Sequence, residues 1–213
     1  GVISAEDAGV SLNTSNYQFT GKMPNQAITF TYQYKLDPDF ETILRVKRVD
    51  NHGNILQEEE RRSVQPGVPV EVDVDELPGY VYPPNIAWED SLSGGSLNQE
   101  TKKLSLTPNL QGGTVTITYT EELTDENYWA KVEFYNGQNG SFNGSTAPKF
   151  VKKSGDYTLA QVTEGLMPTP SAHYSFDGWY KATSNGSNKT GPRLADDTVI
   201  NASIKLFANF EET

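Results

Sequence analysis

The sequence repeats itself at an offset of 87 residues, and this repeat limits what the chain can fold into. The segment from Tyr17 to Leu36 aligns without a gap to the segment from Leu104 to Leu123. The matched pairs are Thr20 with Thr107, Ile28 with Val115, Thr29 with Thr116, Phe30 with Ile117, Thr31 with Thr118 and Tyr32 with Tyr119. A fainter third copy closes the chain at 204–210. A period of this length indicates small domains in tandem, an arrangement typical of stalks, spacers and multivalent binders and rare among enzymes.

Apolar and polar residues alternate along four segments, which predicts strands with one buried and one solvent-facing side. The apolar sets are Ile28, Phe30, Tyr32 and Tyr34; Val68, Val70, Val72 and Val74; Val115, Ile117 and Tyr119; and Ile204, Leu206, Ala208 and Phe210. In the last segment Lys205, Phe207 and Asn209 are expected to point outward. Turn-forming residues, such as those at 50–54 and 111–113, separate the segments. The predicted fold class is therefore mostly β.

One segment, Tyr157 to Leu166, is predicted to be helical. Asp156 is expected to cap its start, and Pro168 and Pro170 to end it. Leu159 and Val162 would share the buried face of this helix. A second, weaker helical pattern lies near Leu97 to Lys103.

Acidic linkers at 36–40 and 121–126 set the predicted domain boundaries. We interpret 1–36 as the C-terminal fragment of a preceding repeat, 41–122 as a complete unit and 128–213 as a complete but diverged unit. The fragment has too little apolar surface to fold alone, so its strand must pair with the next unit or with another chain. Tyr128 and Trp129 follow the second linker and are expected to lock the last two units together.

Charge and cysteine content exclude several classes of protein. The 213-residue chain has a net charge of -11, which disfavours binding to the phosphate backbone of nucleic acids. It has no apolar run long enough for membrane insertion. It also contains no cysteine, which argues against a small disulfide-bonded secreted domain and fits either a cytosolic protein or a bacterial surface protein.

Sequence motifs for catalysis or for a transition metal are missing. There is no Gly-x-Ser-x-Gly, no phosphate-binding loop and no cysteine nucleophile. The two histidines, His52 and His173, are far apart in the sequence and have no cysteine beside them. A carboxylate pair for glycoside cleavage stays open, because 28 acidic residues allow many pairs and none is singled out. We predict a protein that is not an enzyme and has no cofactor and no metal.

The sequence offers two further kinds of candidate site, a calcium site and a covalent cross-link. Oxygen ligands at alternate positions suit calcium, but they are also typical of a solvent-facing strand edge, which we favour here. The two runs are Asp73, Asp75 and Glu76, and Asp37, Asp39 and Glu41. The other kind is a Lys–Asn isopeptide cross-link, for which Lys205 and Asn209 are candidates on the closing strand. Both residues alternate with the buried set of that strand and are expected to face solvent, which argues against a cross-link between their side chains.

The central unit resembles the mucin-binding-protein (MucBP) repeats of Gram-positive surface proteins. The residues that carry this resemblance are the strand and turn Val46 to Leu56, the segment Leu77-Pro78-Gly79-Tyr80 and the closing strand Thr114 to Tyr119. Tyr32 and Tyr34 of the N-terminal fragment match the same closing strand. The insertion from Trp88 to Lys103 departs from the compact pattern of that family.

The last unit resembles a Listeria–Bacteroides repeat, also called the internalin B-repeat. The matching residues are Val132 to Gly137, Phe176-Asp177-Gly178-Trp179-Tyr180, and Asp197-Thr198 with Leu206 to Phe210. Together the two resemblances imply tandem small β-grasp-like modules, with one short helix in the last module. They also imply an extracellular, cell-wall-attached bacterial protein that serves adhesion or surface display.

Two groups of aromatic residues are the candidate binding sites. Tyr80, Tyr82 and Trp88 lie near a predicted loop at Pro83-Pro84, where exposed rings would bind a ligand; the alternative is that they cover the edge of the core. Trp179 and Tyr180 would form a platform for a sugar ring, although we favour a core position for Trp179.

The expected function is a non-catalytic adhesion or stalk region, whose partners are neighbouring repeats and a host glycoprotein or glycan such as mucin. The alternatives are a purely structural spacer and an accessory module of a larger secreted enzyme.

Overall fold

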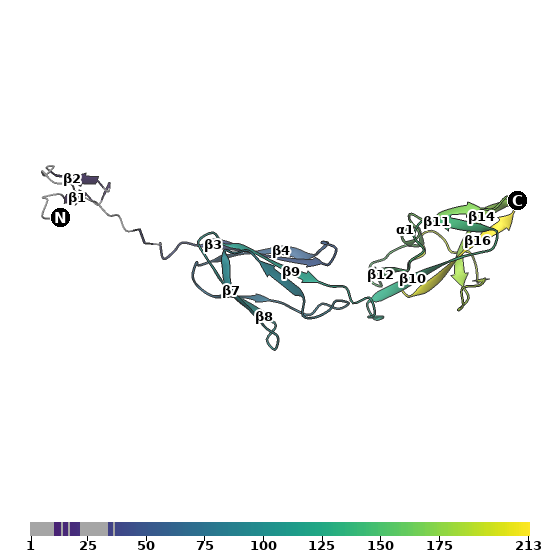
Figure 1. Cartoon of the computed structure of the whole chain (residues 1–213), viewed down its shortest axis with the longest axis horizontal. Coiled ribbons are helices and arrows are strands. Elements are labelled where there is room, and N and C mark those ends of the chain that lie inside the picture. The colour runs from purple at the N-terminus through teal and green to yellow at the C-terminus, as the bar shows by residue number, and fades with distance from the viewer. Residues whose placement is uncertain (1–10, 14, 17, 22–33, 36) are drawn as a thin grey trace. The chain divides into compact units, whose positions relative to one another are not determined.

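The structure is a computed structural model that describes residues 11–13, 15–16, 18–21, 34–35 and 37–213. The chain divides into two compact units, 1–40 and 41–213. In the first unit, β1 (Ser11–Asn13) and β2 (Gln18–Thr20) form an antiparallel hairpin (Figure 1). Of the strand predicted from Ile28 to Tyr34, the residues before Tyr34 lie outside the described residues, and Tyr34 itself is exposed and not in a strand.

The regular elements of the second unit are all strands except for one short helix, so the predicted mostly-β fold class is confirmed. We name the part that holds β3 to β9 the central module and the part that holds β10 to β16 the last module. The strands of the central module are β3 (Thr42–Asp50), β4 (Ile55–Val64), β5 (Val70–Asp73), β6 (Asn85–Trp88), β7 (Leu92–Asn98), β8 (Lys103–Pro108) and β9 (Gly113–Tyr119).

The central module consists of two sheets, ordered β4-β3-β9-β6 and β5-β8-β7, which enclose one hydrophobic core (Figure 1). Its first strand, β3, pairs in parallel with its last strand, β9. The module therefore begins and ends on two neighbouring strands of one sheet.

The alternation seen in the sequence sets which side chains enter this core. Leu44 and Val46 of β3 are fully buried, and Arg45 between them is exposed. In β9, Val115, Ile117 and Tyr119 are buried as predicted. Because successive side chains of a strand point to opposite faces, burial of one set leaves the other on the open face of the sheet.

The last module contains a five-stranded mixed sheet, a two-stranded sheet and the helix (Figure 1). Its elements are β10 (Trp129–Asn136), β11 (Gly140–Asn143), β12 (Lys149–Lys152), α1 (Leu159–Val162), β13 (Met167–Pro170), β14 (Tyr174–Ala182), β15 (Lys189–Thr190) and β16 (Ile204–Glu212). The large sheet has the order β12-β10-β16-β14-β15, and the small one pairs β11 with β13. Its first strand, β10, again runs parallel to its last strand, β16.

One side chain of β16 differs from the prediction. Leu206, Ala208 and Phe210 are buried as expected, but Phe207, predicted to point outward, is only 6% exposed. A Cβ atom added to Gly137 would lie 3.0 Å from the Phe207 ring, so the turn after β10 covers this ring on the far side of the sheet. The sheet therefore buries apolar side chains at this point on both faces.

The predicted helix is much shorter than the sequence suggested, because threonines cap it at both ends. Its N-cap is Thr158 rather than Asp156, and Thr158 and Gln161 form a capping box. Asp156 instead has a φ of 52° and lies before the helix. Thr163 is the C-cap, so α1 comprises only Leu159–Val162, with Leu159 and Val162 buried as predicted.

The second helical prediction, near Leu97 to Lys103, is wrong. These residues form the end of β7, a turn and the start of β8. The Asn98 side-chain oxygen accepts hydrogen bonds from the backbone N–H groups of Glu100 and Thr101, at 2.9 and 3.1 Å. This side-chain bonding to the backbone offers the chain a turn in place of a helix.

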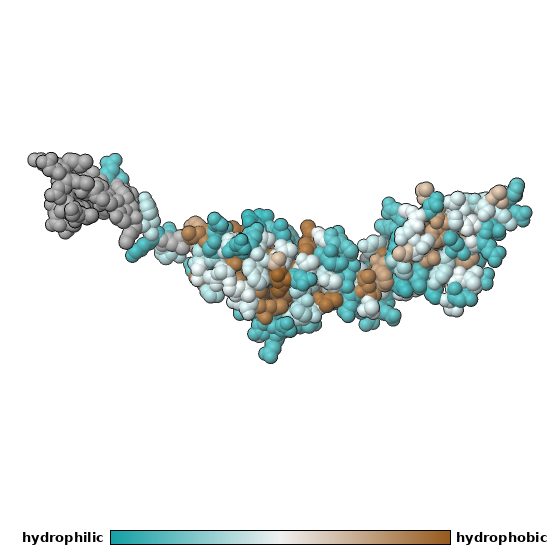
Figure 2. Space-filling view, in the orientation of Figure 1, coloured by the Kyte–Doolittle hydropathy of each residue, from teal (hydrophilic) through white to brown (hydrophobic). Residues whose placement is uncertain are grey.

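Hydrophobic side chains on the visible face of the second unit lie in separate small patches among hydrophilic ones (Figure 2). None of the helical residues that the structure describes forms a segment with the length and hydropathy needed to cross a bilayer.

Candidate functional site

The predicted loop site does not bring its three aromatic rings to one exposed surface. Tyr80 is 7% exposed and belongs to the core of the central module, where it forms an isolated bridge with Glu121. Tyr82 is partly buried and packs against the same core. Trp88 is exposed, at 39%, but it lies in strand β6 rather than in a loop.

Trp88 connects the edges of the two sheets of the central module. A Cβ atom added to Gly95 of β7 would lie 2.3 Å from the Trp88 ring, so the indole rests directly on the Gly95 backbone. Trp88, Lys47, Glu89 and Thr114 are among the residues that line a shallow hollow of about 330 Å³. Of the three candidate rings, Trp88 is the most exposed, whereas Tyr80 and Tyr82 line a separate hollow beside Pro78 and Glu122.

The boundary between the two modules is a buried aromatic contact. Trp129 begins β10 of the last module, yet it is 5% exposed and belongs to the core of the central module. Its indole Nε1–H donates a hydrogen bond to the Gly79 carbonyl oxygen at 2.9 Å, and the Glu122 backbone N–H donates to the same oxygen at 2.8 Å. The prediction that Trp129 locks the two units is therefore confirmed.

Three rings meet edge to face at this boundary. The centroid of Tyr80 lies 6.0 Å from those of Tyr128 and Trp129, and the centroids of Tyr128 and Trp129 are 5.0 Å apart. Such arrangements are favourable because the positive ring edge faces the negative ring face. We name Gly79, Tyr80, Tyr128, Trp129 and Lys152 the aromatic junction.

Lys152 supplies the charge of the aromatic junction. Its Nζ lies 5.8 Å from the Tyr80 ring centroid and 5.9 Å from that of Tyr128. Burial by itself lowers the pKa of Lys152, but the two tyrosines outweigh burial and the pKa is raised. Burial also raises the pKa of Tyr80, with Lys152 opposing it. The junction thus favours a protonated Lys152 beside a neutral Tyr80.

The junction requires glycine at position 79 for two reasons. Gly79 has a φ of 82°, a conformation that L residues with a side chain rarely adopt. A Cβ atom at this position would lie 2.0 Å from the Tyr128 ring. The Pro-Gly-Tyr segment, which the sequence analysis assigned to a repeat motif, therefore forms the surface on which the next module packs.

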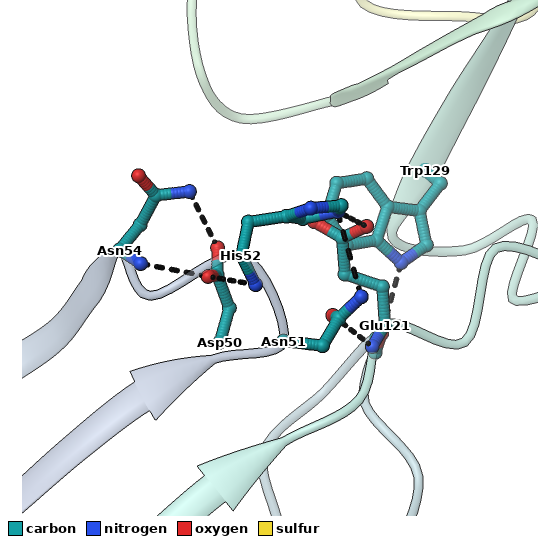
Figure 3. A network of polar contacts seen from close by, with 7 residues as sticks. Asp50, Asn51, His52, Asn54, Glu121 and Trp129 are labelled. Atoms are coloured by element: carbon teal, nitrogen blue, oxygen red, sulfur yellow. Dashed lines mark hydrogen bonds and ion pairs between the residues drawn. The ribbon is translucent and has the colours of Figure 1, made fainter.

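A polar network ties the β3–β4 turn to the strand end beside the junction (Figure 3). Asp50 accepts hydrogen bonds from the backbone N–H groups of His52 and Asn54, both at 2.8 Å. The Asn51 side-chain oxygen accepts from the Glu121 backbone N–H at 3.1 Å, and His52 Nε2 lies 3.2 Å from Glu121 Oε2. Burial raises the pKa of Asp50, but the hydrogen bonds from Asn54 and His52 prevail and lower it.

The second aromatic candidate, Trp179 with Tyr180, is not a sugar platform. Trp179 is 7% exposed, and its ring packs against those of Phe134, Phe142 and Phe176. This position in the core is the alternative that the sequence analysis favoured.

Tyr180 points to the other face of its strand. Its hydroxyl donates to Asp177 Oδ2 at 2.6 Å, which raises the pKa of Tyr180 and lowers that of Asp177. Lys189 Nζ covers the Tyr180 ring at 4.4 Å from its centroid. The face needed for stacking on a sugar is therefore occupied.

The acidic runs do not gather into a metal site in the described part of the chain, where no group of three acidic, histidine or cysteine residues lies close enough together. Asp73 is 3.3 Å from Lys103, and Glu76 is 3.0 Å from Lys102. The isopeptide candidates also have other partners. Lys205 donates to the Ser184 carbonyl, and Asn209 donates to Asp177.

The chain matches no known protein family by family model. It is also without a significant match among the curated proteins.

Proposed function

We propose that this chain is a non-catalytic repeat region of a bacterial cell-surface protein, in which it serves as a stalk that displays an adhesive end. The motifs at 41–122 and 128–213, which resemble MucBP-like repeats and internalin B-repeats, support an extracellular, wall-attached location. An array of mostly-β modules suits this role, because repetition adds avidity and length without new chemistry.

The observation that carries the proposal is the burial of Trp129 in the core of the neighbouring module. A flexible linker would leave each module to move alone, whereas the aromatic junction must be broken before the modules can bend apart. Separating them would expose Trp129 and leave the Gly79 carbonyl without its indole partner, at a cost of about 3–5 kcal/mol. A stalk needs this resistance to bending, and a soluble enzyme domain does not.

The test is a comparison of ¹⁵N relaxation in the native protein and in Trp129→Ala. The stalk proposal predicts one common rotational correlation time for the central and last modules of the native protein. In Trp129→Ala the two modules should tumble separately and with shorter correlation times. Trp88→Ala, which removes an indole away from the junction, should behave like the native protein. Independent tumbling in the native protein would contradict the proposal.

A separate experiment tests the location. Antibodies raised against residues 41–213 should label intact cells that express the full gene product. Labelling only after lysis would rule out surface display, whatever the relaxation data show.

A second candidate function is binding of a host mucin or glycan, and the exposed indole of Trp88 favours it. An indole beside polar side chains provides an apolar face for a sugar ring. Saturable binding to mucin or to a glycan panel should then be lost in Trp88→Ala and kept in Trp179→Phe. Without such binding the chain is a spacer, or an accessory region of a larger secreted enzyme.

A further inference from the structure

All four Asn-Gly sequences of this protein lie in the last module. They are Asn136-Gly137, Asn139-Gly140, Asn143-Gly144 and Asn185-Gly186. Asparagine before glycine is chemically labile, because the small glycine lets its backbone nitrogen reach the asparagine side-chain carbonyl. Three of the four sequences are also followed by serine, which makes them nearly identical in local sequence. Any difference in reactivity among these three must therefore come from the fold.

The fold protects two of the four glycine nitrogens. The Gly137 N–H donates to the Ala208 carbonyl at 2.8 Å, and the Gly186 N–H donates to the Thr183 carbonyl at 2.8 Å. The Asn185 side-chain oxygen is also held, by the Ser187 backbone N–H at 3.1 Å and the Ser187 hydroxyl at 2.7 Å. At these two sites the attacking nitrogen is engaged, and at Asn185 the side chain is fixed as well.

The register of β11 leaves the other two glycine nitrogens unprotected. The Ser171 N–H donates to the Asn139 carbonyl at 2.9 Å, in the same antiparallel register that pairs Gly140 with Pro170. Hydrogen-bonded and non-hydrogen-bonded pairs alternate along such a ladder. The pair of Asn139 with Ser171 is hydrogen-bonded, so the next pair, Gly140 with Pro170, is not, and the Gly140 N–H makes no bond to β13. Pro168 and Pro170, which have no N–H, occupy the matching positions on β13.

Gly144 follows β11 and continues this alternation. Within the described residues its N–H has no hydrogen-bond acceptor. Asn139 and Asn143 are both solvent-exposed. The Asn139 side chain has no hydrogen bond to a described residue, and that of Asn143 has one long contact, 3.5 Å to the Thr169 hydroxyl. Both ends of β11 therefore carry an accessible amide next to a free backbone nitrogen.

We propose that Asn139 and Asn143 are sites of spontaneous deamidation, while the fold protects Asn136 and Asn185. The Gly140 or Gly144 nitrogen loses its proton and bonds to the asparagine Cγ, and the side-chain nitrogen leaves as ammonia. Water then opens the resulting succinimide at one of its two carbonyls. The products are aspartate, or isoaspartate in which the main chain runs through the former side chain.

The modification would change the β11–β13 hairpin. Each event adds a negative charge to a chain that already has a net charge of -11. Isoaspartate at position 143 also lengthens the main chain by one carbon within the paired segment. Because the strand period is two residues, this change disturbs the register that places Phe142 in the core.

The test is incubation of the full chain at pH 8.5 and 37 °C, with peptide mapping by mass spectrometry over several days. Deamidation at Asn139 and Asn143 should proceed at least about tenfold faster than at Asn136 and Asn185. Asn139→Gln and Asn143→Gln, at exposed positions, should each remove only the reaction at the substituted site and leave the rate at the other unchanged. Faster or equal deamidation at Asn185, whose local sequence matches, would overturn the proposal.

A parallel incubation in 6 M guanidinium separates the effect of the fold from that of the sequence. There Asn139, Asn143 and Asn185 should react at similar rates, since all three are Asn-Gly-Ser. If the unfolded chain kept the native order of rates, the fold would not be its cause and the proposal would fail. This inference does not depend on the proposed stalk function.

Discussion

The indole N–H of Trp129 donates a hydrogen bond to the carbonyl oxygen of Gly79, 2.9 Å away and fifty residues earlier in the chain. The donor is the first residue of the last module, and the acceptor lies in the central module. The same oxygen accepts the backbone N–H of Glu122. One carbonyl therefore contacts both the segment that leaves the central module and the strand that begins the last module.

Gly79→Ala should destabilise the protein strongly. A methyl group at this position would lie 2.0 Å from the Tyr128 ring, and the positive φ adds backbone strain. We expect a loss of about 3 kcal/mol or more in the free energy of unfolding, measured with urea and circular dichroism. Gly53→Ala is the matched control, because Gly53 has a similar φ of 85° but no atom within 4 Å of the added methyl. It should cost only about 1 kcal/mol. Equal losses would mean that packing of Tyr128 on Gly79 contributes nothing.

Trp179→Ala should destabilise the last module far more than Trp88→Ala destabilises the central one. Truncation of a buried aromatic residue costs about 3–5 kcal/mol, because a cavity replaces its packing. Trp88 is exposed, so its removal should cost about 1 kcal/mol. Chemical denaturation of both variants measures the difference. A larger loss for Trp88→Ala would contradict the core assignment of Trp179.

The protein should lose stability as the pH rises from about 10 to about 12, partly through Tyr119. Burial raises the pKa of Tyr119 to about 12, and its hydroxyl donates to the Asp75 carbonyl at 2.8 Å. The folded state disfavours the Tyr119 phenolate, so the neutral ring stabilises the fold. This stabilisation is complete below the pKa of Tyr119 in the unfolded chain, and it is lost as the pH rises toward the pKa of Tyr119 in the folded protein. Its size is on the order of 2 kcal/mol. Tyr119→Phe should reduce the slope of unfolding free energy against pH in this range, and an unchanged slope would refute the assignment.

At acidic pH the β3–β4 turn should weaken because of Asp50. Its pKa is lowered in the folded protein, so its carboxylate stabilises the fold above the ordinary value of 3.8. That contribution is lost as the pH falls through the lowered pKa. Asp50→Asn should cost about 1–3 kcal/mol at pH 7 and flatten the acid limb of the stability curve. Asp90→Asn, at an exposed position, controls for the change in net charge. A steep acid limb in Asp50→Asn would contradict this account.

The sequence predicted the strands well, because alternation is a local signal. Val115, Ile117 and Tyr119 are buried in β9 as their spacing required. The core position of Trp179 also followed from a general argument, since a small module needs large rings inside. Composition and periodicity therefore identified the fold class and much of the core.

What the sequence could not supply are partners that lie far apart in the chain. Tyr80 follows a Pro-Gly turn, and the sequence left both an exposed ring and a ring at the edge of the core open; its bridge to Glu121 draws it into the core. The alternation along β16 predicted a solvent-facing Phe207, but the turn at Gly137 covers its ring. The acceptor for Trp129 has no local signal either, since any backbone carbonyl in the preceding module could have taken that role.

The parallel pairing of first and last strands has a mechanical consequence. In the central module the chain enters along β3 and leaves along β9, with seven residue pairs in register from Leu44 with Gly113 to Asp50 with Tyr119. Because both strands run in the same direction, tension along the chain slides one past the other. The ladder is then loaded in shear, with its hydrogen bonds sharing the force, and β10 with β16 repeats the geometry. An antiparallel pair pulled from one end would instead unzip one bond at a time.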